Sequence, residues 1–328
     1  MNDNALGIGS GGPPGVPPGG GVEGHAISRW WRGPGRVVRT ALDDLVTTLY
    51  PTDCRACGGP LLTAGLSPVC DRCVEGVEAQ SMTLCVRCGE ALDMEGVRFA
   101  GQFPVEGLVC SPCRMAPPEF ERAVAYAVYQ DELREMIHLL KYERMASMAR
   151  PLGRFLARAI EMLEGQAGDE LLVVAVPLFP SKERERGYNQ AVLMADAALV
   201  ELKRTRPQWK LRSAHEVIRR VKDTRSQFEL TPKGRRRNLQ GAFKVDDRAA
   251  LAGREVLLVD DIYTTGATAR ACAQVLRRAG ASKVWVATAS RAQAEMVASW
   301  DSSVSWASAS ADAGSGVAGS GVAAWDAG

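Results

Sequence analysis

Eight of the nine cysteines form four C-x-x-C pairs, which are the clearest candidates for metal chemistry in the sequence. The pairs are Cys54/Cys57, Cys70/Cys73, Cys85/Cys88 and Cys110/Cys113. Zinc takes four tetrahedral ligands, and two thiolates three residues apart on a tight turn supply half of a site. The four pairs therefore predict two zinc ions. Because four thiolates leave no open coordination position, both ions are expected to be structural.

Glycine residues indicate how the four pairs combine. Gly58 and Gly89 directly follow the first and third pairs, whereas no glycine follows the second and fourth. Glycine permits a tight turn with positive φ that points backbone N–H groups at sulfur, so each site should open with C-x-x-C-G and close with a plain pair. The predicted sites are Cys54, Cys57, Cys70 and Cys73, and Cys85, Cys88, Cys110 and Cys113. Redox centres or disulfides are the alternatives, but redox C-x-x-C motifs rarely occur four at a time without a thioredoxin-like pattern.

The stretch VLLVDDIYTTGAT, residues 256–268, joins an apolar run to two acids, three hydroxyl side chains and a glycine. A helix that starts after this stretch would offer free N–H groups and the positive end of its dipole to an anion. Gly266 would let the anion approach the backbone, and the hydroxyls are further donors, so the stretch predicts a phosphate site. The hydroxyls belong to Thr264, Thr265 and Thr268. A phosphate would repel Asp260 and Asp261, which should instead face sugar hydroxyls or a divalent cation.

Two basic segments are candidates for binding a second anion. Lys182, Arg184 and Arg186 follow the apolar run LLVVAVP, and Gly187 would allow the backbone to come close to a ligand. Such a charged run is usually a solvated loop, but its place after a buried strand favours a binding role. The second segment, from Arg219 to Arg237, is long, polar and basic, which suits a mobile lid.

Strand and helix patterns alternate along the central part of the chain, and they would position these residues. The predicted strands are 121–129, 171–177, 255–261 and 283–291, with short strands at 215–221 and 241–245. The predicted helices are 131–142, 151–163, 187–204 and 267–280. Strands that are apolar throughout and alternate with helices indicate an α/β fold, a parallel sheet with helices on both faces. Such sheets bind ligands at the carboxyl ends of their strands, where both VAVP and LLVDD end.

Composition divides the 328 residues into four parts. Residues 1–35 are rich in Gly and Pro, and residues 293–328 are rich in Ala, Ser and Gly, so both are expected to be disordered tails. Residues 36–118 should hold an amphipathic helix and a double zinc ribbon, and residues 119–292 the α/β domain. The formal net charge of +2 says little about partners. We expect a cytoplasmic protein without a membrane span, because no apolar run is long enough and no signal peptide is visible.

The whole arrangement resembles the type I phosphoribosyltransferases, and within them the ComF family. VLLVDDIYTTGAT is similar to their phosphoribosyl-pyrophosphate signature, and a zinc ribbon that ends at a proline boundary precedes the domain. Further similarity lies in LKY at residues 140–142, in VPLFPSKERERGYNQ, in Thr224 with Gln227, and in Arg235, Asn238, Gly241, Ala242 and Phe243. The resemblance implies the type I phosphoribosyltransferase fold behind a small zinc-ribbon domain.

The resemblance also implies roles for individual residues. Thr264, Thr265, Gly266, Ala267 and Thr268 would hold the 5-phosphate of phosphoribosyl pyrophosphate, and Asp260 and Asp261 its ribose hydroxyls. Lys182, Arg184, Arg186 and Gly187 would lie near the pyrophosphate, which Lys141 could also reach, so Lys141 and the two acids are the catalytic candidates. Mg²⁺ is expected between pyrophosphate and ribose oxygens.

Two functions of different kinds remain open from the sequence. The first is transfer of the phosphoribosyl group to an unidentified acceptor, with a link to DNA uptake and competence proteins that the resemblance implies. The second is a binding module without turnover, in which the ribbon contacts single-stranded DNA or a protein partner. A homodimer is compatible with either function.

Overall fold

The computed structural model describes residues 52–61, 67–92, 107–223 and 239–293. All of these residues belong to one compact unit. The predicted tails, the helix predicted within 36–51 and most of the predicted lid lie outside the described residues. Thr224, Gln227, Arg235 and Asn238, which contributed to the resemblance, also lie outside them.

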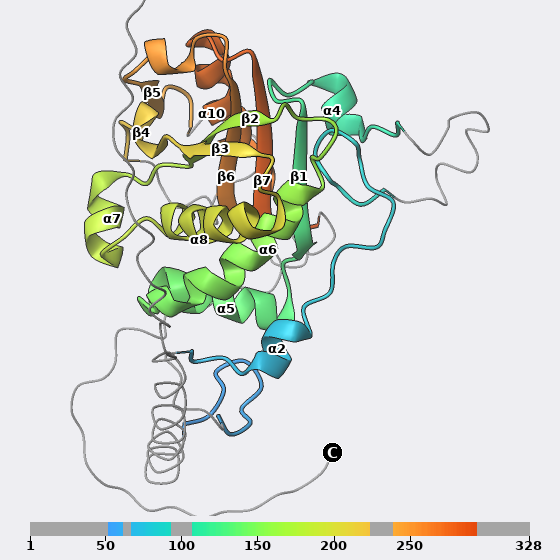
Figure 1. Cartoon of the computed structure of the whole chain (residues 1–328), viewed down its shortest axis with the longest axis vertical. Helices are drawn as coiled ribbons and strands as arrows, with labels where there is room; N and C mark the ends of the chain where they lie inside the picture. Colours follow the sequence, from blue (N-terminus) through green and yellow to red (C-terminus); the bar gives the residue numbers. More distant parts are fainter. Residues whose placement is uncertain (1–51, 62–66, 93–106, 224–238, 294–328) are drawn as a thin grey trace, which may run out of the picture. The chain divides into compact units, whose positions relative to one another are not determined.

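A five-stranded parallel sheet forms the centre of the described chain, and it confirms the predicted α/β fold class. The strands are β1 (Arg122–Val128), β2 (Glu170–Ala175), β3 (Lys210–Ser213), β6 (Glu255–Tyr263) and β7 (Lys283–Arg291). Their order is β1-β7-β6-β2-β3, and every neighbouring pair is parallel (Figure 1). β6 is buried from Val256 to Val259, as expected for a strand covered on both faces. The carboxyl ends of β2 and β6 are neighbours, because Ala175 pairs with Val259.

Helices and a small ribbon cover the two faces of this sheet. One face packs against α5 (Asp131–Tyr142), α6 (Ala149–Glu161) and α8 (Gln190–Thr205), and Figure 1 shows α6 and α8 crossing in front of the strands. The other face packs against α10 (Ala267–Arg278) and the antiparallel pair β4 (Ile218–Arg220) and β5 (Phe243–Val245). The alternation of side chains along β6 separates the two cores, since Leu257 faces the first layer and Leu258 the second.

Several short elements were not predicted from the sequence. They are α2 (Asp71–Glu75), α4 (Ser111–Met115), α7 (Pro180–Arg186), strand β3, and the 3-10 turns η1 (Ala146–Met148), η2 (His215–Val217) and η4 (Ala249–Leu251). The alternative of a solvated loop at 180–186 was wrong: this segment is a helix that starts with Pro180 and ends at Gly187, whose φ is 85°. It buries no residue, so it has none of the apolar periodicity by which a helix is recognised in a sequence. β3 is an edge strand with no buried residue, which also leaves no apolar pattern.

The cysteine segments pack on opposite faces of the sheet. Cys54 and Cys73 belong to the core that includes α5 and α6, and Arg55 donates a hydrogen bond of 2.8 Å to Glu143 just after α5. Cys85 and Cys113 belong to the core that includes α10, on the other face. Each cysteine segment therefore supports a different layer of the α/β fold. No helix of the described residues is long and apolar enough to cross a membrane.

Candidate metal centres and phosphate site

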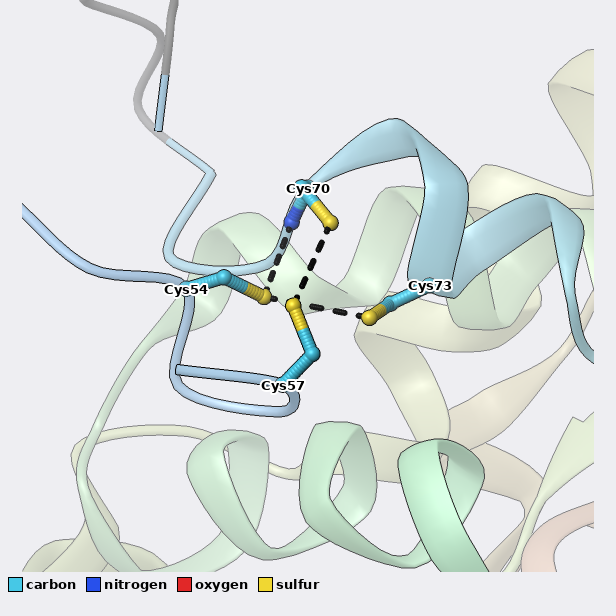
Figure 2. A group of neighbouring side chains, drawn as sticks. All are labelled: Cys54, Cys57, Cys70 and Cys73. Carbon is cyan, nitrogen blue, oxygen red and sulfur yellow. Dashed lines mark hydrogen bonds between the residues drawn. The ribbon is translucent and has the colours of Figure 1, made fainter. Parts of the chain in front are cut away.

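The first cysteine cluster consists of Cys54, Cys57, Cys70 and Cys73. Figure 2 shows the four sulfur atoms pointing toward one another from two short loops and the start of α2. Cys54 Sγ lies 3.9 Å from Cys73 Sγ, and Cys57 Sγ lies 3.9 Å from Cys70 Sγ. Cys57 is exposed and Cys70 half-buried, so this cluster lies near the surface.

The second cysteine cluster consists of Cys85, Cys88, Cys110 and Cys113. All four are buried, and Cys88 Sγ lies 3.6 Å from Cys110 Sγ. The two clusters share one construction. The backbone N–H of Cys70 donates to Cys54 Sγ at 3.3 Å, and that of Cys110 donates to Cys85 Sγ at 3.3 Å. Gly58 and Gly89, with φ of 70° and 72°, have the positive φ that the sequence predicts.

Both clusters have the donors and the spacing that a tetrahedral zinc ion needs. Within each set the four sulfur atoms lie within 4.8 Å of one another. Zinc–sulfur bonds of about 2.3 Å place two tetrahedral ligands about 3.8 Å apart, which matches the sulfur distances given above. Burial alone would raise the pKa of the Cys54 thiol, but N–H donors from Cys70, Cys57 and Ala56 lower it to about 6, which favours the thiolate that zinc requires. The two tetrads could hold two zinc ions.

Asp261 lies at the carboxyl end of β6 and is engaged on both of its carboxylate oxygens. Lys141 Nζ, at the end of α5, lies 2.8 Å from Asp261 Oδ1, and Gln190 Nε2, at the start of α8, donates to Asp261 Oδ2 at 2.9 Å. The side chains of Asp261 and Lys141 are 4% and 12% exposed. Burial would lower the pKa of Lys141, but the charge and hydrogen bond of Asp261 raise it above its ordinary value. Asp261 is therefore paired with Lys141 without any ligand.

Asp260 is in a different environment from its neighbour. It is half-buried, and one of its oxygens accepts a hydrogen bond of 2.9 Å from the backbone N–H of Asp261. Burial and the adjacent Asp261 charge raise its pKa to about 7, while Lys141 and Arg220 act in the opposite direction. A carboxyl group with so high a pKa at a strand end is typical of a functional site.

The loop between β6 and α10 has the features of an anion site. Gly266 precedes α10 with φ of 71°, and a Cβ at this position would lie 2.1 Å from Tyr263 Oη, so only glycine fits. Gly266 and Ala267 are buried, and Thr264, Thr265 and Thr268 are partly buried. Thr265 Oγ1 is buried and has no hydrogen-bond partner among the described residues. An unsatisfied buried hydroxyl at a helix N-terminus fits a phosphate oxygen as its missing partner.

The basic residues predicted near a pyrophosphate do not all come together. Arg186 Nη1 donates to Gln190 Oε1 at 2.7 Å, which links α7 through Gln190 to Asp261 and Lys141. The Arg186 guanidinium also lies 5.5 Å from the centre of the Tyr142 ring. Lys182 instead pairs with Glu185 at 2.9 Å on the outside of α7. Arg184 is exposed, and Gly187 serves as the left-handed end of α7.

Sequence reasoning missed three side chains that shape this region. Gln190 stands within the GYNQ run, but nothing in that run indicates that it would bond Asp261. Tyr263 and Arg291 lie at the ends of β6 and β7, where the Arg291 guanidinium is 4.4 Å from the centre of the Tyr263 ring. The predicted strand 283–291 ends at Arg291, so a charged residue at the end of a buried strand was the available signal.

Several proteins are similar to this chain over most of its length. DNA utilization protein YhgH of Salmonella typhimurium is 31% identical over 240 residues, which are 72% of this chain and 95% of that protein. Competence protein F of Haemophilus influenzae is 28% identical over 237 residues, 71% of this chain and 94% of that protein. Competence protein ComFC of Bacillus subtilis is 33% identical over 109 residues, 33% of this chain and 39% of that protein. No family model matches the chain.

Solved structures align with part of the chain. The allosteric regulatory enzyme of purine biosynthesis aligns with a TM-score of 0.27 and 20% identity, over 44% of this chain and 26% of that one. A hypoxanthine phosphoribosyltransferase from Staphylococcus aureus aligns with a TM-score of 0.23 and 17% identity, over 44% of this chain and 61% of that one. The description of the fold rests on the parallel sheet itself and not on these partial alignments.

Proposed function

The chain belongs to the ComF family, and from this premise we propose that it binds phosphoribosyl pyrophosphate with Mg²⁺ and transfers the phosphoribosyl group to an acceptor. The observation that carries the proposal is the end of β6. There Asp260 and Asp261 directly precede a glycine-containing loop and the N-terminus of α10. A ligand with one phosphate and a neighbouring diol satisfies both halves of this site.

The phosphate half of the proposal rests on the loop at 264–268. The α10 N-terminus offers backbone N–H groups, Gly266 keeps side-chain atoms away from them, and Thr265 Oγ1 lacks a partner. These features suit the 5-phosphate of a phosphoribosyl group. They are also compatible with a nucleoside monophosphate, so ligand competition is part of the test.

The ribose half of the proposal assigns different roles to the two acids. Asp261 is held by Lys141 and Gln190, so it orders the end of α5 and the start of α8 around the site. Asp260 is the acid left to accept hydrogen bonds from ribose hydroxyls or to approach a divalent cation. Bound Mg²⁺ would neutralise charge on the pyrophosphate. Lys141 and Arg186, linked through Asp261 and Gln190, supply positive charge on the same side.

The proposed reaction is substitution at C1 of the ribose. A new bond forms between C1 and the acceptor nucleophile, the bond between C1 and pyrophosphate breaks, and pyrophosphate leaves with the electron pair. The acceptor proton goes to water or a basic group. Because the leaving group gains charge, fixed positive groups stabilise the transition state more than the ground state.

Release of pyrophosphate tests this function. Purified protein, phosphoribosyl pyrophosphate and Mg²⁺ are incubated with a panel of bases and amines, and pyrophosphate is measured. The proposal expects acceptor-dependent release that Asp260→Asn abolishes and Glu201→Gln, an exposed acid substitution on α8, leaves unchanged. If wild-type protein binds the donor but no acceptor in the panel yields pyrophosphate, transfer to these acceptors is excluded.

A second candidate is a binding module without turnover. The observation in its favour is that the relatives carry the names DNA utilization protein and competence protein. In this case the sheet would hold phosphoribosyl pyrophosphate as a ligand, while the cysteine segments contact single-stranded DNA or a protein partner. Salt-dependent binding of single-stranded DNA, together with donor binding but no pyrophosphate release, would favour the module.

A further inference from the structure

Arg291 connects the second cysteine cluster to the phosphate loop. Its side chain is 3% exposed, donates hydrogen bonds to the Cys88 carbonyl oxygen, and pairs with Glu90. Arg291 Nη2 also lies 3.9 Å from Cys88 Sγ. On its other side the guanidinium lies 4.4 Å from the centre of the Tyr263 ring. One arginine therefore contacts both the cluster and the last residue of β6.

Tyr263 in turn fills the space beside Gly266. A Cβ on Gly266 would lie 2.1 Å from Tyr263 Oη and 2.4 Å from its Cζ, so the ring edge adjoins the loop backbone. The ring is fixed on another side by Phe120, whose centroid is 6.4 Å away in an edge-to-face arrangement. A shift of Arg291 or Tyr263 would consequently move the backbone at Gly266.

Arg270 provides a second connection between the same two places. It lies in the first turns of α10, where its backbone N–H donates to the Gly266 carbonyl oxygen at 2.9 Å. Its side chain donates to the Ala116 carbonyl oxygen at 2.6 Å and lies 3.5 Å from Cys113 Sγ. The second cluster is thus tied to the helix that follows the phosphate loop as well as to the tyrosine beside it.

The first cluster has no comparable link among the described residues. The side-chain contact of its loop goes from Arg55 to Glu143 after α5, on the other face of the sheet. Loss of order in the first cluster would reach the site only through α5. Loss of order in the second would reach the phosphate loop through Arg291 and Arg270 directly.

We propose that Arg291 and Arg270 are positioning residues that make the phosphate loop depend on metal in the second cluster. A metal ion would hold Cys88 and Cys113 at fixed positions, and the two arginines would transmit those positions to Tyr263 and α10. Metal at this cluster and an anionic ligand at the loop then bind cooperatively, each strengthening the other by the same factor. The inference deepens the proposed function and rests on its ligand, phosphoribosyl pyrophosphate.

The first experiment compares donor binding by metal-replete variants. Arg291→Gln and Arg270→Gln are titrated with phosphoribosyl pyrophosphate and Mg²⁺, and zinc content is measured for each sample. The matched control is Arg158→Gln, because Arg158 also lies over a tyrosine, 5.7 Å from the Tyr126 ring, but on the other face of the sheet. We expect affinity to fall about 5- to 50-fold in the first two variants, within the usual range of coupling between sites, and to stay unchanged in the control. Unchanged affinity in Arg291→Gln with full zinc would overturn the proposal.

The second experiment needs no ligand, so it separates this inference from the proposed function. Hydrogen exchange is measured for the backbone at 263–270 in wild-type protein, in Arg291→Lys and in Cys110→Ser. Arg291→Lys keeps the charge beside Glu90 but loses the flat contact with Tyr263. We expect faster exchange at 263–270 in both variants and no change in Arg158→Gln. If wild-type protein does not bind the donor, the proposed function fails; if exchange at 263–270 is the same in all variants, the coupling fails.

Discussion

Lys141 Nζ lies 2.8 Å from Asp261 Oδ1, joining the end of α5 to the end of β6. Gln190 occupies the other oxygen of Asp261, and Arg186 donates to Gln190. Four residues from four different elements thus form one hydrogen-bonded chain at the carboxyl edge of the sheet. The chain explains why the acid pair divides its work: Asp261 orders the site, and Asp260 is available to a ligand.

Breaking the ion pair between Lys141 and Asp261 should destabilise the fold. Both side chains are largely buried, so Lys141→Met leaves an uncompensated carboxylate, which typically costs about 3–5 kcal/mol. The double variant Lys141→Met/Asp261→Leu should recover part of that loss. Denaturant unfolding measures both. Equal unfolding free energies for wild type and Lys141→Met would show that the pair contributes nothing.

Asp260 should make the free protein less stable as pH rises. Its pKa is about 7 in the folded protein, above the ordinary value of 3.8, so the folded state holds a proton that the unfolded state has lost between pH 4 and 7. The unfolding free energy therefore falls as pH rises through this range. Asp260→Asn should melt at a higher temperature than wild type at pH 8, and the difference should vanish near pH 3. A constant difference at both pH values would contradict the high pKa.

Binding of the donor should release a proton near pH 6.5. A ligand that prefers the ionised Asp260 lowers its pKa, so wild-type affinity should rise with pH up to about 8 and level off there. Calorimetric titration in buffers of different ionisation enthalpy counts the protons released. Asp260→Asn should bind more weakly and release none.

Gly266→Ala should damage the site more than a comparable glycine substitution elsewhere. Gly253 is the matched control, because its φ of 70° is nearly that of Gly266, yet a Cβ there meets nothing within 4 Å. The shared φ costs about 1–2 kcal/mol in either variant. The additional clash with Tyr263 should remove donor binding in Gly266→Ala alone. If both variants lose binding equally, the contact with Tyr263 is irrelevant.

The two predicted zinc ions should leave the protein at different rates. Cys57 is exposed and Cys70 half-buried in the first cluster, whereas all four cysteines of the second are buried. Release to a coloured chelator should therefore show a fast and a slow phase of equal size. Cys57→Ser should remove the fast phase and keep the slow one. Metal analysis of a reductively purified, folded protein that finds no zinc would refute both sites.

The sequence predicts most of the sheet and of the helices because their apolar patterns are strong. Helix α5 matches the predicted 131–142 at both ends, and β6 and β7 lie where the longest apolar runs predict them. The elements that were missed, α7 and β3, bury no residue and therefore carry no pattern.

The site was predictable in its local parts and not in its long-range contacts. The loop at 264–268 and the C-x-x-C pairs are written in short motifs. The bonds from Lys141 and Gln190 to Asp261, and the stacking of Arg291 on Tyr263, join residues from separate elements that only the folded sheet brings together. No spacing rule within one segment could indicate them.

Calorimetric titration with phosphoribosyl pyrophosphate and Mg²⁺ tests the central claim most directly. The account predicts that wild-type protein binds with one site per chain, that Glu201→Gln binds equally well, and that Asp260→Asn/Asp261→Asn binds at least tenfold more weakly. Equal binding by wild type and the double variant, or no binding by folded wild-type protein, would contradict it.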